Sequence, residues 1–298
     1  MDPDSILDRR RLKRRLAAWR TLAILALIGV VAALTARYAL PIGDHVVRLN
    51  VSGLIVEDAD REEALSELVD DERAQALVVL INSPGGTTAG SEALFHGLRR
   101  VAEKKPVVAV IGTIGTSGGY IVAIAANRIF ARETSLTGSI GVLVETAEFS
   151  RLMEKIGVST EARRSSPLKG QPSPFEPMTD EVRAALDAVL EDSYAWFVDL
   201  VRERRELTPD EAESVSDGRL FTGRQAIGSK LIDAIGGERE ARSWLEAERK
   251  VPSTLPTRDL SYDDEPSLVQ RLADSLAEKV LSFEPLTLDG LVSVWHPR

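Results

Sequence analysis

Short apolar runs alternate with segments of helical periodicity from His45 onward, and this alternation limits the fold more than any other feature of the chain. Residues 58–71, 87–102 and 117–127 have the composition and periodicity of helices. The runs between them are rich in β-branched residues and read as strands: HVVRLNV, QALVVLI, PVVAVIG and RIFA. Strands separated by single helices are typical of βαβ units, so the sequence predicts an α/β fold around a mostly parallel sheet.

The second half of the chain is predicted to be helical around one irregular stretch. A helix is expected from Ala147 to Ile156, and a longer one after the N-cap Thr179, ending near Arg205. Between these helices, RRSSPLKGQPSPFEPMT contains four prolines and is not expected to form a regular element. Shorter helical pieces follow, and residues 266–281 form an amphipathic segment.

The N-terminus combines a basic cluster with an apolar segment. Seven Lys or Arg residues lie between Arg9 and Arg20, and residues 21–36 then carry no charge. Extending the apolar helix to Leu40 gives a length of about 30 Å, enough to cross the hydrocarbon core of a bilayer. We expect residues 21–40 to be an uncleaved transmembrane anchor, with a cleaved signal peptide as the alternative. The basic flank predicts a cytoplasmic N-terminus and a following domain on the outer face of the inner membrane.

The chain therefore divides into four parts. A basic cytoplasmic segment (1–20) and the anchor (21–40) precede one α/β domain (41–250) and a C-terminal extension with an amphipathic helix (251–298). Residues 41–298 carry 29 basic and 43 acidic side chains, a net charge of −14. Binding to nucleic acid needs clustered Lys or Arg, so we do not expect this domain to bind it. The chain has no cysteine and only three dispersed histidines, so no metal site is expected.

One serine lies between glycines where a predicted strand runs into a helix. The pattern Gly115-Thr116-Ser117-Gly118-Gly119 has the G-x-S-x-G form of a nucleophile elbow, in which a tight turn exposes the hydroxyl at a helix N-terminus. A packing position and a phosphate cradle are the alternatives.

The base that would take the proton from this serine is expected to be a lysine. A Ser–His–acid hydrolase needs a downstream histidine, but His296 lies at the end of the chain and His96 in the middle of a predicted helix. A lysine can act as the base when burial lowers its pKa. The candidate is Lys169 in the proline-rich stretch, for which an ordinary surface position is the alternative. The S-x-x-K pattern that begins at Ser166 resembles that of penicillin-recognising enzymes, but Pro172 and nearby prolines prevent the helix it requires.

A second glycine-rich turn, INSPGG at Ile81–Gly86, follows a predicted strand and opens a helix. It is either an ordinary turn or a phosphate cradle, and the lack of a following G-K-[ST] excludes a Walker loop. As a functional alternative, a backbone N–H of this turn could pair with that of Gly118. Together the two would form an oxyanion hole for a substrate carbonyl.

Four motifs in this order, INSPGG, TSGGY, TGSIGV and K-x-x-x-SPF-x-PMT, resemble the signal peptide peptidase A family of membrane-anchored Ser–Lys proteases. The resemblance covers about Val46 to Gly237 and corresponds to the short form of the family, with one catalytic unit. It implies a Clp/crotonase-like fold with a βαβ superhelical core. The sequence departs from the family pattern at Ile121 and Leu168, where aromatic residues are frequent.

The resemblance also implies a role for individual residues. Ser117 would be the nucleophile, Lys169 the general base, and Ser139 the residue that orients the lysine amine. The oxyanion N–H groups would come from Gly86 and Gly118, and the substrate would also contact Gly85, Thr116 and Gly119. No metal or organic cofactor is required.

The expected function is that of a membrane-anchored serine endopeptidase that degrades cleaved signal peptides or other membrane-associated peptides. Short family members form ring-like homo-oligomers, which implies active sites shared between protomers. One alternative is a stomatin-partner-type protease of the same fold with a specific membrane protein as its substrate. Another is a non-catalytic scaffold that binds peptides. A crotonase-like acyl-CoA enzyme is not expected, because an exported acidic domain would meet no coenzyme A.

Overall fold

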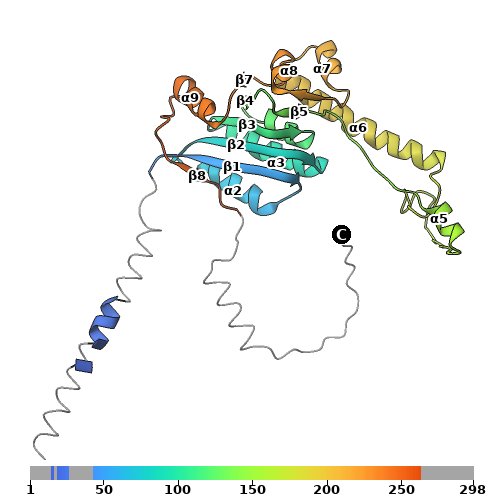
Figure 1. Ribbon diagram of the computed structural model, residues 1–298, viewed down its shortest axis with the longest axis horizontal. Helices are drawn as coiled ribbons and strands as arrows, with labels where there is room; N and C mark the ends of the chain where they lie inside the picture. Colours follow the sequence, from blue (N-terminus) through green and yellow to red (C-terminus); the bar gives the residue numbers. More distant parts are fainter. Residues whose placement is uncertain (1–14, 17–18, 27–42, 263–298) are drawn as a thin grey trace, which may run out of the picture.

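The structure, a computed structural model, describes residues 15–16, 19–26 and 43–262 (Figure 1). Residues 15–16 and 19–26 are helical. Among the described residues, no helix is both long and apolar enough to cross a membrane. Most of the expected anchor, residues 27–40, and the amphipathic segment 266–281 lie outside the described residues, so both remain predictions.

A mixed α/β architecture is observed, with one sheet at its centre. The strands are β1 (His45–Ile55), β2 (Ala74–Gly86), β3 (Val107–Thr116), β4 (Arg128–Ala131), β5 (Leu136–Gly138), β6 (Leu220–Thr222), β7 (Ala234–Ile235) and β8 (Thr257–Asp259). They are ordered β6-β5-β3-β2-β1-β8, with β4 beside both β3 and β7. Every pairing is parallel except the antiparallel pair β5–β6. The predicted α/β class with a mostly parallel sheet is confirmed.

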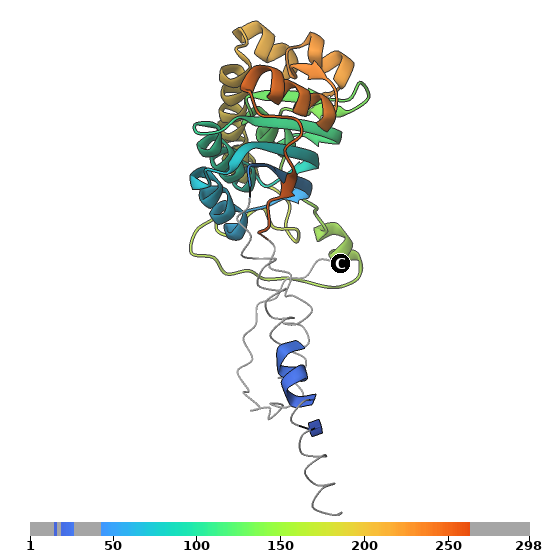
Figure 2. The same ribbon diagram turned by 90° about the vertical axis from the view of Figure 1, so that its left-hand side faces the viewer.

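Helices cover both faces of this sheet. They are α2 (Ala59–Asp70), α3 (Thr88–Ala102), α4 (Gly118–Ile124), α5 (Ser150–Lys155), α6 (Asp180–Arg205), α7 (Pro209–Val215), α8 (Gly223–Gly228) and α9 (Glu238–Arg249). Leu77 and Val79 of β2 belong to the larger core beneath α2, α3 and α4, whereas Val78 packs with Leu245 of α9 on the opposite face. Figure 2 shows α2 and α3 stacked along one side of the strands. Burial on both faces explains why these strands are continuous apolar runs.

Several predicted elements are confirmed with small changes at their ends. The Thr87 hydroxyl caps α3 by accepting from Gly90 N at 3.1 Å, and Thr179 caps α6 in the same way. The helix expected over residues 147–156 is shorter in the structure, because α5 includes only Ser150–Lys155.

One prediction at the site is wrong. The segment NSPGG was expected to be a turn, but it continues β2 as far as Gly86. Parallel partners on both sides hold it extended, since Ser83 pairs with Gly115 of β3 and Gly86 with Ile55 of β1. The register shifts next to Ser83, and this irregularity accommodates the proline and the glycines within a strand.

Residues 141–178, here called the arm, separate β5 from α6. Within the described part of the chain, each hydrogen bond and ion pair of the arm has both partners inside the arm, as in the bond from Phe149 N to Pro174 O at 2.7 Å. Figure 1 shows α5 standing away from the sheet, on the side where β1 and β2 end. The proline-rich stretch contains no helix or strand, as predicted.

Candidate active site

Ser117 lies at the junction between β3 and α4, in a backbone conformation that is rare for a residue with a side chain. Its φ is 52° and its ψ is −120°, at the N-cap position of α4. The backbone is held there from both sides: Ser117 N donates to Gly138 O at 2.9 Å, and Ser117 O accepts from Tyr120 N at 2.8 Å. A positive φ at a serine costs free energy, and such strained strand-to-helix turns are typical of nucleophile elbows.

Two glycine-rich segments come together beside this serine. A methyl group added to Gly85, whose φ is 116°, would lie 2.9 Å from Gly118 N and 3.0 Å from Ser117 Cβ. A methyl group added to Gly118 would lie 3.2 Å from Gly86 N. The end of β2 and the start of α4 are therefore in direct contact, and no side chain would fit between them. Because the first N–H groups of a helix have no partner within the helix, this contact places potential hydrogen-bond donors beside Ser117.

The other two residues expected to contact substrate support this close approach. The Thr116 side chain is buried and donates to Pro84 O at 3.1 Å. A methyl group on Gly119 would lie 2.8 Å from Ser83 O. Both residues therefore hold β2 against the junction of β3 and α4.

Ser139 lies next to Ser117 across the sheet. In the pairing of β3 with β5, Thr116 is opposite Gly138. Ser117 and Ser139 directly follow these two residues, so they lie side by side at the ends of two neighbouring strands. Ser139 also has a positive φ, 51°, and its N donates to Arg219 O at 2.8 Å. The structure thus brings together Ser117, Ser139 and the glycines of β2.

Two buried hydroxyls that the sequence did not single out organise this site. Ser83 Oγ donates to Gly53 O at 2.6 Å and accepts from Gly85 N at 3.0 Å, which ties β2 to β1 beside the glycines at the end of β2. Ser91 Oγ donates to Thr87 O at 2.9 Å and fills the space facing Gly118. Their only signal in the sequence is a glycine nearby, Gly85 for Ser83 and Gly90 for Ser91, which does not distinguish them from other serines.

Helix α4 is fixed at its far end by two arginines. All seven of its residues are buried. Arg204 of α6 donates to Ile124 O at 2.8 Å and to the neighbouring Ala126 O, and Arg99 of α3 donates to Ala125 O at 3.0 Å. Burial lowers the pKa of Arg204 from its ordinary value. Cations at a helix C-terminus satisfy its free carbonyls and stabilise its dipole, so these contacts hold the helix that begins at Ser117.

Lys169 lies in a different region of the molecule. It is exposed in the arm, and its backbone N donates to Ser166 O at 3.2 Å. The loop around it is closed by Glu176, which accepts from Arg164 at 2.7 Å and from Gln171 at 3.0 Å. In the described part of the chain, no hydrogen bond or ion pair connects this loop to the sheet. The structure therefore does not bring Lys169 and Ser117 together within one chain.

The fold and the site define a class: an α/β protein with a serine on a strained strand-to-helix turn beside glycine backbone amides, as in serine-type hydrolases. Comparison with known proteins makes this more specific, because residues 99–252 match the sequence profile of peptidase family S49. The chain belongs to peptidase family S49. The predicted resemblance to signal peptide peptidase A is thereby confirmed at the level of the family.

Several relatives of this chain are named as proteases or peptidases. It is 36% identical over 229 residues to a "Putative protease" of Synechocystis sp., covering 76% of this chain and 82% of that protein. It is 28% identical to a "Putative signal peptide peptidase SppA" of Enterococcus faecium, covering 69% of this chain and 64% of that one. For Protease 4 of Salmonella typhi the identity is 30%, over 89% of this chain and 41% of the relative.

A solved structure, a ClpP1 mutant from Listeria monocytogenes, aligns with 65% of this chain and 92% of its own. The TM-score is 0.43 and the sequence identity 13%.

Proposed function

We propose that this protein is a membrane-anchored serine endopeptidase in which Ser117 is the nucleophile and Lys169 the general base. The observation that carries this proposal is the strained turn at Ser117, packed directly against the glycines at the end of β2. Neither the positive φ nor the removal of every side chain from this contact is needed for packing alone. Both are expected where a serine hydroxyl must meet a substrate carbonyl beside free backbone amides.

The proposed reaction follows from these positions. Neutral Lys169 takes the proton of Ser117, whose Oγ attacks the scissile carbonyl carbon. The negative charge that develops on the carbonyl oxygen is held by the N–H groups of Gly86 and Gly118. When the peptide bond breaks, the leaving amine takes the proton from the Lys169 ammonium. Water then attacks the acyl-enzyme with Lys169 again as base, the ester bond to Ser117 Oγ breaks, and Ser117 takes back a proton from the Lys169 ammonium. Ser139 orients the lysine amine throughout.

The proposed substrates are cleaved signal peptides or other apolar peptides at the outer face of the inner membrane. The apolar segment 21–40 and its basic flank support the anchoring, and the name of the relative from Enterococcus faecium supports the substrate class. The rim of the site is also apolar. Leu54 and Val56, which flank the partner of Gly86 in β1, are 74% and 51% exposed, so an apolar peptide side chain would find contacts beside the glycines at the end of β2.

A site shared between copies of the chain accounts for the separation of Ser117 from Lys169. The arm that holds Lys169 exposes many large apolar side chains, which is typical of a protein–protein contact. They are Leu143, Val144, Phe149, Leu152, Ile156, Val158, Leu168 and Phe175. We therefore include in the proposal a head-to-tail ring of the Clp/crotonase type, in which the arm of one protomer brings Lys169 to Ser117 of its neighbour.

Labelling with a fluorophosphonate tests the nucleophile directly. The purified full chain should form a covalent adduct that peptide mapping places on Ser117, and Ser117→Ala should lose both the adduct and peptidase activity. Ser159→Ala, which removes an exposed serine of the arm, is the matched control and should keep both. An unlabelled wild-type chain that still binds apolar peptides would identify a non-catalytic scaffold instead.

A further inference from the structure

The amino ends of the parallel strands form an edge of the domain on which basic side chains gather. His45, the first residue of β1, pairs with Ala74, the first residue of β2. A hollow of about 480 Å³ lies beside Ala74, and its lining includes Lys104, Arg249 and Lys250. The chain therefore enters the sheet from its N-terminal segment next to this hollow.

A tryptophan stacked with two arginines borders the same edge. Trp244 of α9 is half-buried, with the guanidinium carbon of Arg128 5.5 Å from its ring centroid and that of Arg249 at 5.3 Å. Arg128 Nε is buried and has no hydrogen-bond partner. Within the described residues, no carboxylate forms an ion pair with Arg128, Arg249, Lys104 or Lys250. These cations thus remain available for an anion from outside the domain.

Nearby acidic residues offset only part of this charge. Asp70 and Glu72 line the same hollow, against four basic side chains. One of these four, Lys105, is taken up by the protein, because its Nζ donates to Asp71 O and burial lowers its pKa. Without Lys105, the residues that line the hollow carry three positive and two negative charges, a net charge of +1 on a chain whose net charge is −9.

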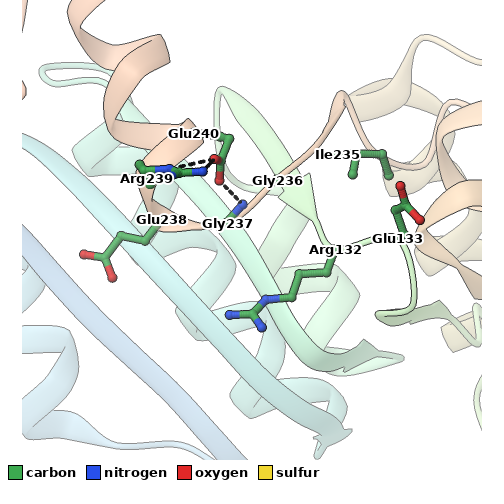
Figure 3. A pocket seen from close by; sticks show the side chains of 8 residues that line it. All are labelled: Arg132, Glu133, Ile235, Gly236, Gly237, Glu238, Arg239 and Glu240. Atoms are coloured by element: carbon green, nitrogen blue, oxygen red, sulfur yellow. Dashed lines mark hydrogen bonds and ion pairs between the residues drawn. The ribbon is translucent and has the colours of Figure 1, made fainter.

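The opposite end of α9 differs. There a hollow of about 670 Å³ is lined by Arg132, Arg239 and three glutamates (Figure 3). Glu240 accepts from Gly237 N at 2.8 Å and from Arg239 at 3.0 Å, so the carboxylate already occupies the helix N-terminus and pairs with the arginine. The two ends of α9 thus differ: Arg239 at its start pairs with Glu240, whereas Arg249 at its end has no acidic partner among the described residues.

We propose that the amino-edge patch, comprising Lys104, Arg128, Trp244, Arg249 and Lys250, binds the phosphate groups of anionic phospholipids and rests the domain on the bilayer. Guanidinium groups stacked on an aromatic ring keep their N–H groups for bidentate contact with phosphate. Tryptophan favours the interface between lipid and water. The proposal rests on the anchoring included in the proposed function, because the tether enters the domain at this edge.

The test uses the absence of cysteine from the chain. A single cysteine at the exposed Ala247 of α9 carries an environment-sensitive fluorophore. One at the exposed Thr113, toward the carboxyl end of β3, serves as the reference position. The labelled full chain is reconstituted into vesicles of phosphatidylcholine alone or with a third of phosphatidylglycerol. Position 247 should report an apolar environment only with phosphatidylglycerol. The signal should disappear at about 1 M salt, where the Debye length falls to roughly 3 Å, and position 113 should not respond.

Matched variants of α9 assign the effect to the patch. Arg249→Gln should lower the docked fraction relative to the undocked one about fivefold, the effect of removing one cation near an anionic surface. Arg239→Gln, at the other end of the same helix, should leave it unchanged. An equal signal in both vesicle types, or an equal loss in both variants, would overturn the proposal.

Alkaline carbonate extraction separates this result from the anchoring itself. A chain that stays with the vesicles but shows no effect of phosphatidylglycerol at position 247 refutes the patch alone. A chain released by carbonate refutes the anchor. Binding by the patch is then measured by adding vesicles to the released chain. The fluorescence at position 247 and the variants Arg249→Gln and Arg239→Gln again decide the outcome.

Discussion

At the scale of single residues, Ser117 and Ser139 share an unusual backbone. Both have a φ near 50°, and they follow residues that face each other in the pairing of β3 with β5. Two strained residues at the end of one ladder need an environment that fixes them, and the bond from Ser117 N to Gly138 O provides part of it. The strain thus holds two hydroxyls at fixed positions on the edge where a substrate would bind.

The chemistry proposed for Lys169 makes a specific prediction. Lys169→Ala should lower kcat/KM by about 10²–10⁴-fold, the usual contribution of a general base. Lys169→Arg should not restore activity, because a guanidinium does not lose its proton near neutral pH. Peptide hydrolysis by purified variants measures both effects. Lys155→Ala, which removes another exposed lysine of the arm, should behave as wild type. An active Arg variant would contradict the assignment of the base.

Single residues were predictable from the sequence where a pattern combined with its position. The position of Ser117 between a strand and a helix could be predicted, because G-x-S-x-G follows an apolar run and precedes a helical segment. Ser83 and Ser91 could not, because their importance depends on Gly53 and Gly118, which contact them only in the folded chain. The sequence left open whether Lys169 is a base or an ordinary surface lysine, and its exposure in one chain leaves the choice to how copies of the chain meet.

At the scale of elements, the loop that holds Lys169 is ordered by side chains and not by regular structure. Glu176 accepts hydrogen bonds from Arg164 and Gln171, and the bond from Arg164 lowers the pKa of this carboxylate. Because the folded-state pKa is depressed, the stabilisation is present above the ordinary glutamate pKa of about 4.3 and is lost as the pH falls below it. At neutral pH the ion pair between Glu176 and Arg164 that orders the loop is therefore present.

Opening this loop should impair catalysis without removing a catalytic group. Glu176→Gln should lower kcat/KM about tenfold or more, because small displacements of a reacting group are costly. Glu161→Gln, which removes the carboxylate paired with Arg163 elsewhere in the arm, is the matched control and should have no effect. Hydrolysis rates together with limited proteolysis of the arm provide the measurement. Equal activity in the two variants would show that the ion pair at Glu176 does not order the loop.

The longer elements could be predicted and the shorter ones could not. Strands β1 to β3 and helices α3 and α6 have enough residues to show a period or an apolar run. Strands β5 to β8 have two or three residues each, too few for any pattern, and they exist because a neighbouring strand end offers free hydrogen-bonding groups. The segment NSPGG resembled a turn in the sequence because its extended form depends on pairing with the neighbouring strands β1 and β3.

At the scale of the whole molecule, the body and the arm depend on different kinds of contact. The body has its own core on both faces of the sheet, whereas the arm exposes apolar side chains and within the described residues bonds only to itself. An arm of this kind is expected to be stable against a second surface. In the proposed mechanism Ser117 needs a base and the arm carries Lys169, so a neighbouring copy would satisfy both needs at once.

Mixing inactive chains tests this arrangement. Ser117→Ala and Lys169→Ala, each inactive alone, are co-expressed and purified together. If each site combines Ser117 of one protomer with Lys169 of its neighbour, random mixing in a head-to-tail ring leaves about a quarter of the interfaces with both wild-type groups, and activity should return to about that fraction. Co-expression of Ser117→Ala with the double variant provides the matched control, because no serine nucleophile is then present. Mixed assemblies of normal size without activity would place the serine and the lysine of each site on one chain.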